Sequence, residues 1–147
     1  MELYKLNLHR PLEYQVVAAL TSPVWEGIAH IVQNLNEGAE CIAEISEASL
    51  LTADDQGPHA LFPLPEPLRF GTSALQKHTQ NNELIMIPQG TYIFTQHRWT
   101  DPLSAYEALD WFIRESWWQR ETAEGPFYVR WVREDGKTAL QILRKQN

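Results

Sequence analysis

Short motifs recur in the same order in the two halves of the chain. Residues 21–24, Thr-Ser-Pro-Val, return at 100–103 as Thr-Asp-Pro-Leu, an offset of 79. Weaker matches at offsets of 81, 77 and 78 keep this order: Glu2-Leu3 with Glu83-Leu84, Pro11 with Pro88, and Tyr14 with Tyr92. A repeated unit in the sequence predicts a repeated unit in the structure. Because Ser-Pro and Asp-Pro are also common ways to start a helix, chance recurrence is the alternative.

Each copy of the longer motif begins a predicted helix. Ser22 and Asp101 can accept hydrogen bonds from unpaired amides at the N-cap, and a proline follows each of them. The apolar spacing predicts one helix over 23–36 and a second over 102–118. Strand-like segments flank both helices, at 14–20, 41–45, 68–75, 83–87, 92–99, 127–133 and 138–143. We therefore expect an α+β fold of duplicated strand–helix–strand–strand units, with a mostly antiparallel sheet and two main helices on one face.

The length of 147 residues fits one domain, 1–147. Its first repeat covers about 1–76 and its second about 83–145. Asp135-Gly136 lies between two strand-like segments and predicts a hairpin, since both turn positions favour positive φ. Residues 52–67 contain one glycine and four prolines, so we expect a long irregular loop that connects the halves.

The charge and the apolar pattern exclude several classes of partner. The net charge is −7 and the cations are scattered, so nucleic-acid phosphates would repel the chain. No apolar run approaches the roughly 20 residues that span a bilayer, and the first residues lack the apolar core of a signal peptide. The single cysteine cannot form an internal disulfide. We expect a cytoplasmic protein with no nucleic-acid or membrane partner.

Motifs of catalysis and metal binding are missing from the sequence. It has no glycine-rich phosphate loop, no paired cysteines and no His-Glu-x-x-His. No two of the five histidines lie three or four residues apart, so no helix face presents two metal ligands. Cys41 lies in an apolar segment, which is typical of a small core residue rather than a nucleophile. We expect no catalytic residue, no metal and no cofactor.

The six tryptophans are the most informative side chains. On a helical wheel, Trp111 and Trp118 share a face nearly opposite Leu109, beside Glu107. This face could stack on a flat cation, since ring faces attract positive charge. It could equally form a dimer or partner interface, where tryptophan is enriched. Cover by the proline-rich loop is the third alternative.

Alternation along 127–133 separates the side chains of that strand into two sets. Phe127, Val129 and Trp131 lie on one face, and Tyr128, Arg130 and Val132 lie on the other. One face must contact the second helix, and the other can line a groove. Glu44 lies in an apolar segment, where a carboxylate is either a ligand's counter-charge or an acid/base group. The pattern favours a non-functional alternative, in which the Glu44 side chain points to solvent from a half-buried strand.

Three segments of the second half, at 87–94 (IPQGTYIF), 105–111 (AYEALDW) and 125–131 (GPFYVRW), resemble the gyrase-inhibitor-like (GyrI-like) domain family. The family pattern is an Ile-Pro-Ala-Gly-x-Tyr strand, a helix with a Tyr-x-x-Leu stripe and a tryptophan, and a strand led by Gly-Pro. The resemblance covers 83–145. It implies a duplicated fold with a groove near a pseudo-two-fold axis.

The resemblance also implies a function. Members of the family bind amphipathic, often cationic, small molecules and include effector-binding domains of multidrug-responsive regulators, and some are reported as hydrolases. The family often has a glutamate two residues before a tyrosine in the Gly-Pro-led strand. Val129 and Trp131 occupy those positions here, which weakens the case for cation selectivity and for acid/base catalysis.

Together these observations predict a stand-alone small-molecule-binding domain for amphipathic ligands, cationic ones included. The expected contact residues in a groove between the repeats are Tyr92, Trp111, Tyr128 and Trp131, with Glu107 as the polar partner. The alternative is an interaction or inhibitor/immunity-type protein that uses an acidic, tryptophan-rich surface toward a second copy or another protein. A hydrolase is the third hypothesis. Because no DNA-binding segment precedes the first repeat, we expect no complete regulator in this chain alone.

Overall fold

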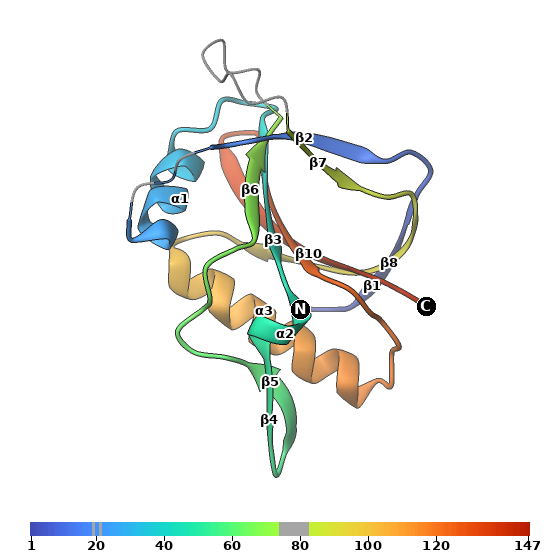
Figure 1. The fold of residues 1–147 in the computed structure, drawn as a ribbon. Coiled ribbons are helices and arrows are strands. Elements are labelled where there is room, and N and C mark those ends of the chain that lie inside the picture. The colour runs from blue at the N-terminus through green and yellow to red at the C-terminus, as the bar shows by residue number, and fades with distance from the viewer. Residues whose placement is uncertain (19, 21, 74–82) are drawn as a thin grey trace.

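The computed structural model describes residues 1–18, 20, 22–73 and 83–147, which form an α+β fold (Figure 1). The helices are α1 (Val24–Gln33), α2 (Glu47–Leu50) and α3 (Pro102–Trp118). The strands are β1 (Tyr4–Leu8), β2 (Leu12–Val16), β3 (Glu40–Ile45), β4 (Leu51–Asp54), β5 (Gly57–Ala60), β6 (Arg69–Thr72), β7 (Leu84–Ile87), β8 (Gly90–Arg98), β9 (Phe127–Glu134) and β10 (Lys137–Lys145). In this described part of the chain, no helix has the length and apolar character needed to cross a lipid bilayer.

Eight strands form one antiparallel sheet in the order β1-β8-β10-β9-β3-β6-β2-β7. The order has an internal symmetry in which β1 corresponds to β7, β2 to β8, β3 to β9 and β6 to β10. If each strand is swapped with its counterpart, reading the sheet from its other edge gives the same order again. Moreover, β1 pairs with β8 and β7 pairs with β2, so each half supplies an edge strand to the other. The predicted fold of two strand–helix–strand–strand units, β2-α1-β3-β6 and β8-α3-β9-β10, is confirmed.

The sheet has an apolar core on each face. Helices α1 and α3 lie on one face, where Trp131 is fully buried against the rings of Trp25, Phe70 and Trp99. Figure 1 shows the outer strands curving away from the helices on the opposite side. The concave face formed there encloses a second apolar cluster that includes Tyr14, Ile42, Tyr92, Tyr128 and Leu143. The alternation predicted for 127–133 is confirmed, because Phe127, Val129 and Trp131 belong to the helix-side core.

The two main helices differ in how well their ends were predicted. Helix α3 has the predicted limits, and the Asp101 carboxylate accepts a hydrogen bond from the Ser104 amide at 3.0 Å in a capping box. The predicted N-cap of the other helix is wrong, since Pro23 takes that position with extended backbone and Ser22 makes no cap. Helix α1 also ends at Gln33 and not at residue 36, because the Asn34 amide turns back to the Ile31 carbonyl in a tighter turn.

The expectation of an irregular loop over 52–67 is wrong for its first part. There β4 and β5 pair from Leu51 with Ala60 to Asp54 with Gly57. The Ala60 amide donates to the Asp110 carboxylate on α3 at 3.0 Å, a contact that no local sequence pattern encodes. Among the described strands, β5 pairs with β4 alone. Its proline can therefore lie on an edge strand, where the missing backbone N–H costs no sheet hydrogen bond. The predicted strand at 68–75 is β6, and residues 74 and 75 lie outside the described residues.

The predicted hairpin between β9 and β10 is confirmed. Asp135 and Gly136 both adopt positive φ, of 52° and 72°. The Glu37 carboxylate accepts hydrogen bonds from both of their amides, so the turn is also held by the segment after α1.

Candidate functional site

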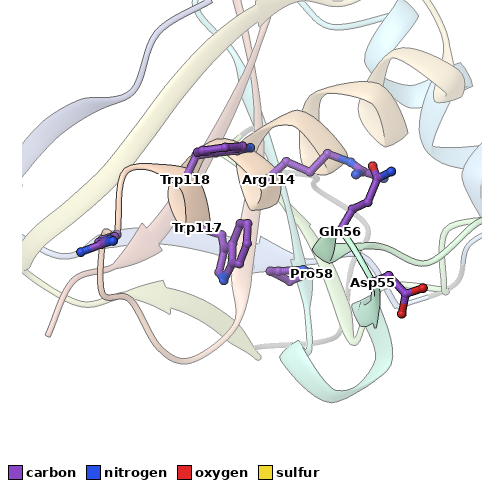
Figure 2. Close-up of a pocket in the computed structure, with 7 residues that line it drawn as sticks. Asp55, Gln56, Pro58, Arg114, Trp117 and Trp118 are labelled. Atoms are coloured by element: carbon purple, nitrogen blue, oxygen red, sulfur yellow. The ribbon is translucent and has the colours of Figure 1, made fainter.

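A cleft of about 640 Å³ lies between the C-terminal end of α3 and the β4–β5 hairpin (Figure 2). Three residues from the hairpin, three from the end of α3 and one just beyond it line the cleft: Asp55, Gln56, Pro58, Arg114, Trp117, Trp118 and Arg120. The hairpin belongs to the first half of the chain and α3 to the second. The cleft therefore lies between the halves, but not at the residues predicted for the groove.

Two neighbouring tryptophans form the aromatic part of this cleft. The Trp117 side chain is 51% exposed and that of Trp118 is 74% exposed, with ring centroids 6.1 Å apart. Figure 2 shows Trp117 projecting from the helix toward Pro58. The ring also lies so close to Gly57 that a Cβ atom there would come within 3.1 Å of it. Gly57, with φ of +110° and no side chain, thus leaves the space in which the Trp117 ring packs against the hairpin.

A single carboxylate on α3 holds both walls of the cleft. Oδ1 of Asp110 accepts the Ala60 amide of β5, and Oδ2 accepts Nε of Arg114 at 2.9 Å. The hydrogen bond that Arg114 donates to Asp110 raises the pKa of Arg114 above its ordinary value. The Asp110 carboxylate therefore fixes the position of Arg114 at the cleft in an ion pair, and it also holds the hairpin through the Ala60 amide.

Arg120 lies just beyond the end of α3 with left-handed backbone, at φ of 55°. Its amide bonds to the Trp117 carbonyl at 3.1 Å, and the Glu121 amide bonds to the Ser116 carbonyl at 2.9 Å. This pattern closes a helix C-terminus and usually has glycine at the left-handed position. In the described part of the chain no acceptor engages the Arg120 guanidinium, which lines the cleft. A charged side chain thus occupies a position where glycine would be less strained.

The five residues predicted to line the groove do not share one surface. Tyr92 and Tyr128 lie together in the concave-face cluster, where the Tyr92 hydroxyl donates to the Pro88 carbonyl at 2.6 Å. Trp131 lies on the opposite face and has no exposed surface. The three-residue spacing between Tyr128 and Trp131 in β9 puts them on opposite sides.

The other two predicted residues lie on α3. Trp111 is half-buried with its ring centroid 5.7 Å from that of His97, whose pKa is lowered by burial and by the N-terminal ammonium. Glu107 is exposed. Of the predicted aromatic face, Trp118 alone reaches the cleft, and Leu109 is fully buried on the other side of the helix, as the wheel predicts.

Glu44 is buried, and the expectation that it points to solvent is wrong. It accepts a hydrogen bond from Arg69 at 2.9 Å on the concave face of the sheet. Burial, with the Glu44 charge nearby, raises the pKa of Tyr128 to about 12. The carboxylate is thus neutralised by an arginine of the neighbouring strand β6.

Cys41 should resist thiol reagents in the folded protein. The side chain has no exposed surface, and burial raises its pKa to about 12, so neither access nor the thiolate is present near neutral pH. We expect a disulfide reagent such as DTNB to label Cys41 only at urea concentrations that unfold the chain. Labelling that is complete in native buffer would contradict this core position.

No group of three or more His, Cys, Asp or Glu side chains placed to hold a metal ion occurs in residues 1–18, 20, 22–73 and 83–147. Comparison of the sequence with protein-family models and with curated proteins gives no match.

Proposed function

We propose that this protein binds flat, amphipathic small molecules that carry an acidic group, in the cleft between α3 and the β4–β5 hairpin. The observation that carries the proposal is the pairing of two exposed tryptophan rings with Arg120, held in left-handed backbone at the same cleft. Strained residues with functional side chains are typical of ligand sites. The volume of about 640 Å³ is that of a site for a small organic molecule.

The charges of the cleft argue for an anionic ligand. Arg120 lines it with no described side-chain partner, while Arg114, which also lines it, is paired with Asp110, and Asp55 is the one carboxylate among the residues that line the cleft. A guanidinium binds a carboxylate or sulfonate through two parallel hydrogen bonds. The exposed indole faces offer stacking to any aromatic body. This geometry favours an aromatic acid over the cationic ligands that the sequence led us to expect.

We also propose that the chain is a GyrI-like binding domain located in the cytoplasm. The three motifs in 83–145 and the exchanged strand order support the family. The single, buried and reduced cysteine suits a reducing compartment.

Two substitutions at Arg120 separate its backbone strain from its charge. Arg120→Gly should raise the free energy of unfolding by about 1 kcal/mol, since glycine adopts positive φ without strain. Arg120→Gln should leave stability nearly unchanged. Both should weaken binding of the aromatic sulfonate 8-anilinonaphthalene-1-sulfonate about tenfold, the equivalent of one charge-assisted contact. Urea unfolding and a fluorescence titration of the folded protein measure the two effects.

Matched variants give this experiment its controls. Arg10→Gln removes an exposed arginine outside the cleft and should leave the affinity unchanged. Trp118→Ala should weaken binding at least as much as Arg120→Gln while the fold persists. If the sulfonate binds all four variants and the wild type alike, or if cationic acridine orange binds more tightly than the sulfonate, the proposed ligand chemistry is wrong.

A second candidate function is recognition of a protein partner along α3. Phe62 is 64% exposed and packs edge-on against Tyr106, with ring centroids 4.9 Å apart. Leu103, one turn earlier on the helix, is also exposed. An apolar surface away from the cleft is typical of an interface. Sedimentation of the wild type and of Phe62→Ser would detect a dimer, and a monomer that still binds the sulfonate would favour the small-molecule function.

A further inference from the structure

A second hollow lies on the concave face of the sheet, near the β9–β10 turn. Three lining residues are register partners in a row across it: Arg98 on β8, Ala139 on β10 and Val132 on β9. Val132 lies on the concave face because its neighbour Trp131 belongs to the helix-side core. Ala139, in the middle of the row, has the shortest side chain and leaves space above β10. The hollow shares no lining residue with the α3 cleft.

A row of hydrogen-bonded polar side chains borders this hollow on one side. Gln96 on β8, Gln141 on β10 and Arg130 on β9 are register partners, two residues along each strand from the first row. Nη1 of Arg130 donates to Oε1 of Gln141 at 2.8 Å. Nε2 of Gln141 in turn donates to Oε1 of Gln96 at 2.9 Å.

Arg130 fixes the direction of every hydrogen bond in this row. A guanidinium can only donate, and its Nε is held by Glu40 at 2.7 Å and by the Tyr14 hydroxyl at 3.0 Å. Gln141 must therefore turn its carbonyl oxygen toward Arg130 and its amino group toward Gln96. Gln96 must then accept with its own carbonyl oxygen. The amino group of Gln96 is left over, and it has no acceptor among the described residues.

Arg98 adds a positive charge beside this free amino group. It follows Gln96 by two residues on β8, so the two side chains lie on the same side of the strand. The Arg98 side chain is exposed, and no side chain in the described part of the protein forms an ion pair or hydrogen bond with it. Free donors and one unpaired cation therefore meet at the β8 side of the hollow.

The other charged groups near the hollow offset one another. Arg130 forms an ion pair with Glu40. Lys137 and Glu134 are register partners across β10 and β9, where their opposite charges face each other. Asp135 lies in the turn beyond them, farther from Arg98 along the sheet. The charge without a described partner at this end of the sheet is thus that of Arg98.

We propose that this hollow binds a medium-chain aliphatic carboxylic acid. Its carboxylate accepts hydrogen bonds from Arg98 and from the amino group of Gln96. Its alkyl chain crosses Ala139 toward Val132, a path of two strand spacings, roughly 10 Å. An amine or a neutral amide would place N–H groups against these donors and leave them without an acceptor.

Four probes test the charge and the chain separately: hexanoate, hexanamide, hexylamine and acetate. In ¹H–¹⁵N NMR titrations of the folded chain, hexanoate should shift the side-chain amides of Gln96 and Gln141. Hexanamide should bind about tenfold more weakly, the equivalent of one lost charge-assisted contact. Acetate should also lose at least about tenfold, because it lacks the carbons that cover the apolar row. Hexylamine should not shift either amide.

Three substitutions separate the parts of the hollow. Arg98→Gln should weaken hexanoate binding about tenfold and leave hexanamide binding nearly unchanged. Gln96→Glu keeps an acceptor for Gln141 but replaces the free amino group with a carboxylate oxygen, so it should abolish hexanoate binding. Ala139→Leu fills the space above β10 and should also abolish it. The Gln141 side-chain amide reports binding in all three variants.

Arg10→Gln is the matched control, since Arg10 is exposed and does not line the hollow. The proposal is wrong if hexanoate shifts neither amide, if hexanamide or hexylamine binds as tightly as hexanoate, or if Ala139→Leu binds hexanoate like the wild type. It is equally wrong if Arg10→Gln weakens binding as much as Arg98→Gln does. Arg120→Gln, in the α3 cleft, should leave hexanoate binding unchanged. An effect of Arg120→Gln without one of Arg98→Gln would assign the acid to that cleft and overturn the proposal.

Discussion

Replacement of Trp131 by alanine should lower the free energy of unfolding by about 3–5 kcal/mol, the range for large aromatic residues in a packed core. The side chain has no exposed surface, and the rings of Trp25, Phe70 and Trp99 surround it. Those rings cannot fill the space of a lost indole without moving α1 or the sheet. Because small domains are stable by about 5–15 kcal/mol, this variant should melt far below the wild type. Urea unfolding followed by circular dichroism measures the loss.

Two further substitutions test the reason for this loss. Trp131→Phe should be much milder, because it keeps an aromatic ring. The Trp131 indole N–H also has no acceptor among the described residues, so its removal leaves none of their acceptors unpaired. Trp118→Ala removes an equally large side chain from an exposed position and should change stability by less than about 1 kcal/mol. Equal losses for Trp131→Ala and Trp118→Ala would contradict the burial of Trp131.

Arg130→Met should lower the free energy of unfolding by about 2–4 kcal/mol. The substitution leaves the Glu40 carboxylate and the Tyr14 hydroxyl without their shared cation on the concave face. The Glu40 side chain is 26% exposed, which places the expected loss below that of a fully buried pair. Burial alone would lower the pKa of Arg130, but Tyr14 and Glu40 raise it above the ordinary value, so the charge persists at every pH of the experiment.

A double substitution distinguishes lost pairing from lost packing. Arg130→Met with Glu40→Gln removes the stranded charge and should recover part of the stability, as expected for two coupled residues. Arg10→Met changes an exposed arginine and should cost less than about 0.5 kcal/mol. A double variant that is as unstable as the sum of the two single variants would show that the residues act independently.

Local signals were sufficient to predict α3 and the last hairpin. Asp101 caps the helix, Pro102 starts it, and Asp135-Gly136 adopts the two positive φ angles that a tight turn needs. The chemistry of these positions depends on neighbours within four residues. The core positions of β9 followed equally from alternation, since burial on a sheet repeats every second residue.

Other features depend on contacts between distant parts of the chain, and the sequence predicted them poorly. The β4–β5 hairpin is held by Asp110, fifty residues later, and its turn carries no strong hairpin pair. Strand β1 pairs with β8 across more than eighty residues, although the repeat already matched residues 2–3 with 83–84. Pairing partners of this kind are chosen by the whole sheet and not by a local pattern.

The same limit applies to the candidate site. The helical wheel predicted that Trp118 lies opposite Leu109, and both exposures agree with it. Trp117, however, lies on another side of α3 and was missed, because the hairpin that receives its ring was itself not predicted. Arg120 carried no signal, since an arginine after a helix gives no indication of left-handed backbone. A tryptophan pair followed within three residues by an arginine was the available hint.

The exchanged edge strands have a consequence for how such a chain can be cut and recombined. The first strand of each half pairs with a strand of the other half. Neither half could therefore form a complete sheet if the other were deleted. Two separately expressed halves would instead complete one another, in the manner of a split reporter protein. Any change of the linker between the halves would have to preserve the pairing of β1 with β8 and of β7 with β2.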